Sequence, residues 1–411
     1  MQMSAVDTML SHNTVGTLPE RLTLRLCFIW LIFAISCLVF VEPAPYDGLL
    51  ILVGLYCFTF GLRFSPHLAT PLFFLSGYIL ANLIATMLAP DPIHCLKHMA
   101  VTFFLIFSWG FFASIIHDNP LRLYKIIWNG YIFSAVLAVC LGLIGFLKIT
   151  PYYELFLFFD RVKGPFKDPN VFGPYLIPVA VYLILQLESA KGKLDFLKRI
   201  GLLLFVVAGI LLSFSRGAWF NLVMAATMYT ILRLVTARSR ADTAALIKIV
   251  SLVVIAIMVI AIWAVTTIDD IGQVFSHRAQ LVQSYDKGSD GRFDAILIAI
   301  NRSLIQPMGI GPGQASEVLA LDPHNLFVHI MVETGWLGAF AFSGFIVVTL
   351  KEGFAVCMQP SKIQNICIVL FVCLLSTLLE SMIIHSTHWR HLYVVLGMLW
   401  GGISAKRSNF V

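Results

Sequence analysis

Long apolar blocks divide the chain, and they limit it to one class of fold. The blocks are roughly 17–25 residues long, which is the length a helix needs to cross a ~30 Å hydrocarbon core. A strand exposed to lipid would leave its backbone groups unpaired, so each block is expected to be helical. The sequence therefore predicts an all-α polytopic membrane protein with about 12 transmembrane helices. The predicted spans lie near 26–41, 48–62, 69–89, 99–116, 126–147, 171–187, 200–214, 218–235, 246–265, 325–350, 363–384 and 391–405.

The composition excludes several other classes of protein. Hydrophobic residues make up 59% of the 411 residues and charged residues only 12%, whereas ordinary soluble domains are about 25% charged. So few charges cannot cover the surface of a water-soluble globule of this size. A soluble multidomain enzyme, a secreted disulfide scaffold and a nucleic-acid binder are excluded, although the net charge is +6.

The basic residues predict the orientation in the membrane. With an even number of spans, both termini lie on one side, and that side carries 17 of the 28 Lys and Arg residues. Because basic loops stay cytoplasmic, we predict cytoplasmic termini. The segment before Leu26 has no small-residue cleavage site, so the first span is expected to direct insertion itself. The predicted organisation is one integrated domain: a bundle of about nine spans (1–265), a large outer loop with surface helices (266–323) and about three further spans (324–411).

The outer segment 148–170 contains three basic residues close together, Arg161, Lys163 and Lys167. One interpretation is a solvated basic turn in which Asp168 and Asn170 cap the helix that follows. The other is a cradle that binds a phosphate group. Both interpretations remain open, because the spacing of the residues fits either.

A single arginine, Arg216, lies in the very short outer turn between the spans 200–214 and 218–235. An uncompensated guanidinium at the membrane edge is costly. Arg216 could snorkel to lipid phosphates. We favour a contact with a substrate phosphate, because the planar guanidinium matches phosphate oxygens.

The long outer segment 266–323 contains a predicted amphipathic helix over 293–305, expected on the bilayer surface. Arg292 stands at the start of this helix, and Arg278 precedes it. The glycine-rich run 309–313 is not followed by Lys-Ser/Thr, so we interpret it as a tight bend and not as a phosphate-binding loop.

The tenth span opens on His324 and Asn325, and His329 and Glu333 follow one helical turn apart. These residues can share a stripe on one helix face, and intramembrane ionisable residues are functional candidates. A second histidine group, 385, 388 and 391, is interpreted as interfacial, and no metal or cofactor site is predicted.

Several of these motifs, taken in order, resemble the O-antigen ligase and polysaccharide polymerase superfamily. They are the turn 164–173, Ser215–Trp219, Gly-Arg292 before an outer helix that ends in Pro-x-Gly-x-Gly, and His324-Asn followed by Glu-x-Gly-x-x-Gly. The resemblance implies a bacterial inner-membrane glycosyltransferase of the lipid-dependent (GT-C-like) type, active on the periplasmic face. By position, Arg216, Arg292 and His324 correspond to functional residues of that family.

The resemblance also implies an undecaprenyl-diphosphate-linked glycan as donor. Arg216 and Arg292, helped by Arg161, Lys163, Lys167 or Arg278, would then stabilise the leaving diphosphate, and His324 would act as general base. Glu333 or Asn325 would fix the tautomer of His324. We therefore expect a metal-independent inverting transfer at the periplasmic face of the lipid bilayer. The acceptor is lipid A–core for a ligase, which we slightly favour because the outer loop is compact, or a lipid-linked glycan for a polymerase. A transporter or lipid flippase and a non-catalytic scaffold are the alternatives from other classes.

Overall fold

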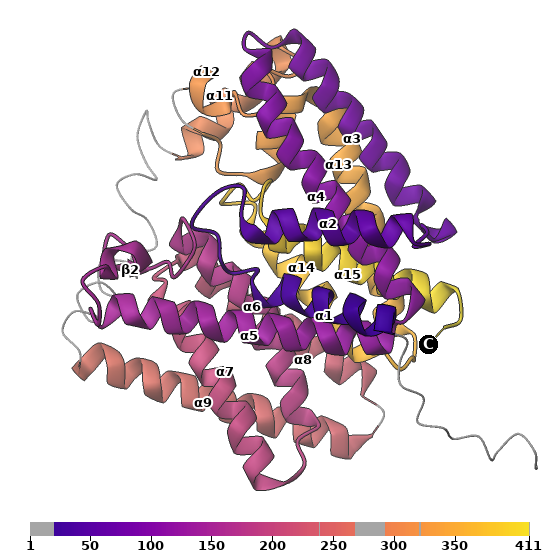
Figure 1. The fold of residues 1–411 in the computed structure, drawn as a ribbon. Helices are drawn as coiled ribbons and strands as arrows, with labels where there is room; N and C mark the ends of the chain where they lie inside the picture. Colours follow the sequence, from indigo (N-terminus) through magenta and orange to yellow (C-terminus); the bar gives the residue numbers. More distant parts are fainter. Residues whose placement is uncertain (1–19, 238, 268–291, 320–321, 411) are drawn as a thin grey trace, which may run out of the picture.

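A computed structural model describes residues 20–237, 239–267, 292–319 and 322–410. Every predicted span overlaps a helix, although several boundaries differ (Figure 1). These helices are α1 (Glu20–Ala34), α2 (Pro45–Thr59), α3 (Ala69–Leu88), α4 (Pro92–Asp118), α5 (Pro120–Phe146), α6 (Pro169–Glu188), α7 (Gly192–Leu212), α8 (Arg216–Thr236), α9 (Arg240–Thr267), α13 (Leu326–Met358), α14 (Gln364–Glu380) and α15 (Arg390–Arg407).

The connections contain short elements. They are the 3₁₀ helices η1 (Pro66–Leu68) and η2 (Tyr153–Phe156), the helices α11 (Arg292–Ile305) and α12 (Ala315–Val318), and the strands β1 (Leu157–Phe158) and β2 (Arg161–Val162). The two strands pair antiparallel, with Phe158 opposite Arg161. This hairpin precedes α6 and shapes the segment in which the basic residues lie.

The predicted class, an all-α polytopic membrane protein, is confirmed. Within the described residues, seven helices are long and apolar enough to cross a membrane, and three shorter ones are also apolar. The helices α7 and α15 are long enough but too charged to be among them, because α7 carries four charged residues in its first two turns and α15 carries charges at both ends. The total of about 12 spans stays a prediction.

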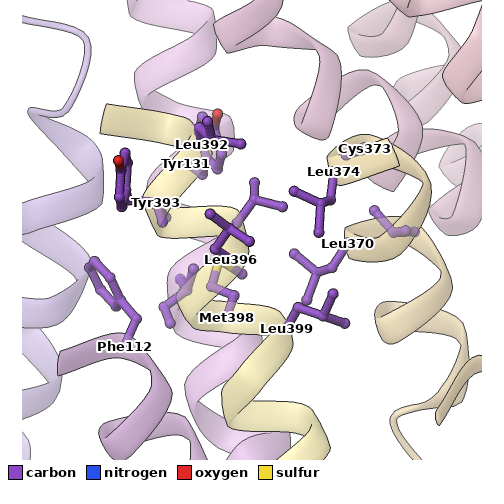
Figure 2. Packing of buried hydrophobic residues seen from close by; sticks show 14 of the residues in the cluster. Phe112, Tyr131, Leu370, Cys373, Leu374, Leu392, Tyr393, Leu396, Met398 and Leu399 are labelled. Atoms are coloured by element: carbon purple, nitrogen blue, oxygen red, sulfur yellow. The ribbon is translucent and has the colours of Figure 1, made fainter. Parts of the chain in front are cut away.

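The helices form two groups with α14 and α15 between them (Figure 1). On one side α13 packs along α3, and on the other α6 packs along α7 and α8; α15 contacts α4, and α14 contacts α8. Figure 2 shows Leu396 and Leu399 of α15 beside Leu370 and Leu374 of α14. These four leucines are fully buried. Burial of a leucine side chain contributes about 1.5–3 kcal/mol in water, but between helices in lipid, close packing itself holds the pair together.

The helix α13 is broken, although the sequence predicts one uninterrupted span over 325–350. Gly335 has φ 71° and ψ −174°, which lies outside the helical region. The segment before α13 fills the break: Trp336 N–H donates to Pro307 O (3.0 Å), and Ile310 N–H donates to Val332 O (2.9 Å). Backbone groups that the broken helix leaves unpaired are thus bonded within the protein, as a membrane interior requires.

We expect Gly335→Ala to destabilise the protein strongly. A Cβ at position 335 would lie 2.3 Å from Pro307 O, and the positive φ is unfavourable for alanine. The conformational strain alone is worth about 1–3 kcal/mol. The measurement is the thermal midpoint of the detergent-solubilised protein. Gly201→Ala is the matched control, since a Cβ there meets nothing within 4 Å, and its midpoint should not fall. Equal midpoints for the two variants would contradict the described break.

Candidate functional site

The basic turn before α6 is tied to the turn between α7 and α8. Arg161 is buried; its Nε donates to Ser213 O (3.0 Å) and its Nη2 to Asn170 Oδ1 (2.9 Å). Ser215 Oγ donates to the same Asn170 oxygen (2.8 Å). Arg161 and Asn170 therefore hold the α7–α8 turn against the start of α6.

The α7–α8 turn presents Arg216 as the first residue of α8. Phe214 is buried and has φ 46°, a conformation that is uncommon for a bulky residue. Ser215 caps α8 by accepting from Ala218 N–H (3.3 Å). Arg216 is half-buried. Its side chain starts at the positive end of the α8 dipole, which adds to its attraction for anions.

The C-terminal end of α14 lies directly against this turn. Glu380, the last residue of α14, is completely buried, and its Oε2 accepts from Asn221 Nδ2 (2.7 Å). Its other oxygen, Oε1, has no hydrogen-bond partner among the described residues. A Cβ at position 217 would lie 2.6 Å from Oε1, so Gly217 permits this close approach. Glu380 belongs to the site environment although it was not among the predicted site residues. The signal for it was an isolated carboxylate inside an apolar span.

We expect Gly217→Ala to lower stability by about 1–3 kcal/mol, the usual cost of overpacking. The added methyl group must displace the buried Glu380 carboxylate, which Asn221 holds in place. Glu380→Asp shortens the opposing side chain. The Gly217→Ala/Glu380→Asp double variant should therefore lose less free energy of unfolding than the sum of the losses measured for the two single variants. Strict additivity would show that positions 217 and 380 are not in contact.

The same end of α14 supports the start of α13. Leu326 N–H donates to Ser381 O (2.8 Å), and Asn325 Nδ2 donates to Met382 O (3.1 Å). His324, which immediately precedes these residues, is thereby held beside the segment that follows Glu380. The turn with Arg216 and the segment with His324 thus adjoin the same helix end.

Asn325 acts as the N-cap of α13. Its Oδ1 accepts from Phe327 N–H (3.0 Å) and Val328 N–H (3.1 Å). With its amide nitrogen also bonded to Met382 O, Asn325 has a structural role that accounts for its buried position. Its predicted contact with substrate stays a prediction.

A polar cluster lies next to His324. The ring of His324 stacks on that of His385 at a centroid distance of 6.0 Å, and His385 stacks on His329 at 4.7 Å. His329 Nε2 lies 3.4 Å from Asp322 Oδ1, and His329 Nδ1 lies 3.6 Å from Glu333 Oε2. The predicted proximity of His329 and Glu333 is confirmed. Asp322 and His385 were not among the predicted site residues.

Asp322 and His385 of this cluster differ in charge, because their surroundings shift the two pKa values in ways that favour a charged carboxylate and a neutral imidazole. Burial opposes ionisation of Asp322, but the close imidazole of His329, with the nearby His385 and His324, outweighs it and holds the pKa of Asp322 below its ordinary value. Burial, together with the neighbouring His329, lowers the pKa of His385 to about 4, because a buried imidazole resists protonation. Asp322 is therefore an anion and His385 is neutral at pH 7.

Lys167 contacts other residues than Arg161 does, although both belong to the basic turn before α6. Its Nζ is 2.5 Å from Glu42 Oε2, and Arg390 Nη1 is 3.5 Å from Glu42 Oε1. These three residues, with several aromatic side chains, line a cavity of about 130 Å³. Burial opposes ionisation of Glu42, but the two cations outweigh it and lower the pKa of its carboxyl group. Lys163 is held in the preceding turn by its backbone N–H, which donates to Phe156 O (3.0 Å).

The structure does not describe the side chains of two predicted site residues. Arg278 and the side chain of Arg292 lie outside what the structure describes; Arg292 is the first residue of α11. Along α11, Ala295 and Ala299 are buried, whereas Leu297 and Leu304 are 58% and 62% exposed. The helix predicted over 293–305 is confirmed, and its contact with the bilayer surface stays a prediction.

The helices and the cluster at their ends define a multi-pass membrane protein with ionisable residues gathered at one end of its bundle. Residues 201–343 match a protein-family model described as O-antigen ligase. Over this segment the match supports the predicted resemblance to the O-antigen ligase superfamily, and it suggests an enzyme of the ligase or glycosyltransferase type. The matched segment contains Arg216, Arg292, His324 and Glu333. A comparison with curated proteins gave no match.

Proposed function

We propose that this protein transfers a glycan from an undecaprenyl-diphosphate donor to an acceptor sugar hydroxyl, as an O-antigen ligase that acts on lipid A–core. One observation carries the proposal: Arg216 and His324, both inside the family-matched segment, adjoin the same end of α14. A phosphate-binding cation and a proton acceptor are the two groups that such a transfer needs.

On the donor side, Arg216 and Arg292 stabilise the departing lipid diphosphate. Negative charge grows on the phosphate oxygens as the glycosidic bond breaks, and an arginine keeps its charge at any working pH. Arg161, Lys163, Lys167 and Arg278 are further candidates for contact with phosphate. Because Arg161 binds Ser213 O and Asn170, its contribution includes holding the turn that carries Arg216.

On the acceptor side, His324 takes the proton of the attacking hydroxyl. The acceptor oxygen bonds to the anomeric carbon, the bond from that carbon to the diphosphate oxygen breaks, and its electron pair leaves with the lipid diphosphate. This single displacement inverts the anomeric centre. The reaction needs no metal in this proposal, because arginines provide the positive charge at the diphosphate.

We further propose a bacterial inner-membrane location with both termini cytoplasmic and the site on the periplasmic face. The excess of Lys and Arg in the loops on the side of the N-terminus supports this orientation. The exposed leucines of α11 support its contact with the bilayer surface. A GT-C-like bundle of about 12 spans belongs to the same proposal.

The break in α13 bears on the transporter alternative. Interrupted helices line the ion and substrate sites of many secondary transporters. Here the carbonyl groups of Val332 and Glu333 at the break accept from Ile310 N–H and Gly311 N–H, so these oxygens are engaged inside the protein. This arrangement favours the enzyme over the transporter.

Purified protein in detergent, with a synthetic undecaprenyl-diphosphate glycan and EDTA, tests the proposal. No membrane gradient exists in this assay, so a transporter makes no product. Product formed only when lipid A–core is added is the result expected for a ligase. Longer lipid-linked chains without lipid A–core would instead assign the polymerase activity, and no product under either condition would refute the transfer.

A further inference from the structure

Three side chains from separate parts of the chain direct ligand atoms toward one point. Asp322 precedes α13, His329 lies in its first turns, and His385 lies between α14 and α15. One ligand atom from each lies within 4.8 Å of the others. Asp322 Oδ1 and His329 Nε2 are 3.4 Å apart, and Asp322 Oδ2 and His385 Nδ1 are 3.9 Å apart.

These separations suit a small divalent ion. Donor atoms about 2.0–2.2 Å from a tetrahedral zinc ion lie roughly 3.4 Å from one another. Two imidazoles and one carboxylate are a ligand set that first-row transition metals prefer, and they leave a further coordination position open. Magnesium and calcium, which favour all-oxygen sites, fit poorly.

Unsatisfied buried atoms are an independent sign of a ligand. Among the residues that the structure describes, Asp322 Oδ1 and His385 Nδ1, which face the proposed point, are buried without a hydrogen-bond partner, as is His329 Nδ1 on the side toward Glu333. His329 as a whole is only 7% exposed. Buried polar atoms are normally satisfied, so several orphans in one cluster require an explanation.

The surroundings of His329 resemble the outer shell of a metal site. On the side away from Asp322, His329 Nδ1 faces Glu333 Oε2 at 3.6 Å. Glu333 is itself fixed by Gly313 N–H, which donates to Oε1 (2.8 Å). A carboxylate behind a histidine fixes the tautomer in which the other nitrogen binds the metal.

We propose that Asp322, His329 and His385 bind one divalent transition-metal ion of the zinc type. The ion joins the segment before α13, α13 itself and the α14–α15 connection, which are the segments around His324. It has no part in bond breaking, so the inference does not depend on the proposed glycan transfer.

Zinc titration of the EDTA-treated and dialysed full-length protein tests the site. We expect one Zn²⁺ per chain by calorimetry and a rise in thermal midpoint, because an ion that binds only the folded state stabilises it. Glu333→Gln should weaken binding by about 10–100-fold, and Asp322→Asn and His385→Ala should weaken it further. His388→Gln is the matched control from the same connection and should bind as the wild type does.

Asparagine has nearly the same shape as aspartate, so Asp322→Asn should fold and keeps the test valid if His385→Ala does not fold. Co²⁺ in place of zinc should give the visible absorption of a four-coordinate site in the wild type and lose it in Asp322→Asn. Two results would overturn the site. One is a wild type that binds zinc no more tightly than Asp322→Asn does, and the other is a His388→Gln variant that loses as much zinc affinity as Asp322→Asn does. Neither result bears on glycan transfer, which is measured separately in EDTA.

Discussion

Replacement of Arg216 by alanine is expected to lower the rate of glycan transfer by about 10²–10³-fold, the effect of removing one group that stabilises developing charge. Arg216 begins α8 beside the buried end of α14, so its guanidinium acts with the dipole of that helix. The loss should fall on kcat more than on the KM for the donor, because charge on the diphosphate is greatest in the transition state.

Arg216→Lys separates charge from geometry. Lysine keeps the charge but not the planar pair of donors that matches phosphate oxygens, so activity between wild type and alanine is expected. Arg122→Ala, in the first turn of α5, is a matched control and should retain full activity. If Arg216→Ala transferred glycan as fast as Arg122→Ala, Arg216 would have no role at the diphosphate.

Replacement of His324 by alanine is expected to lower kcat by about 10²–10⁴-fold, because the acceptor hydroxyl loses its proton acceptor. Binding of the donor should be nearly unchanged, since the arginines remain. Steady-state rates and a separate donor-binding measurement distinguish the two effects.

His324→Gln keeps a hydrogen-bonding side chain but cannot accept the proton, so it should be almost as slow as alanine. His117→Gln, near the C-terminal end of α4, where His117 Nε2 lies 3.0 Å from Ser408 Oγ, is the control. Wild-type kcat in His324→Gln would exclude general-base catalysis by His324.

The sequence predicts the helices well because the membrane imposes a simple rule on their length and polarity. Boundaries are less predictable. The first span was predicted to reach residue 41, but α1 ends at Ala34 and Val39 N–H donates to Pro165 O (3.2 Å) in the basic turn. The break at Gly335 was missed because the apolar residues before Glu333 and after Gly335 continue the pattern of a single span.

The site residues were predicted from the order of the motifs along the sequence. That order does not reveal which side chains contact one another in the folded protein. For Arg161 the sequence left a phosphate contact and a structural turn both open; its guanidinium binds Ser213 O and Asn170, and its contact with phosphate stays a prediction. Asp322 and His385 escaped prediction because tertiary packing alone joins them. The histidines 385, 388 and 391 were considered as one group by their spacing, whereas only His385 contributes to the cluster with Asp322 and His329.

The most direct test of the central claim is the single-turnover rate of glycan transfer by the wild type and by the Arg216→Ala/His324→Ala double variant, in detergent with EDTA. We expect the wild type to convert donor and lipid A–core into product. Because the two residues act in one transfer step, the double variant should be little slower than the slower single variant. A double variant that transfers at the wild-type rate, or a wild type that forms no product, would contradict the account.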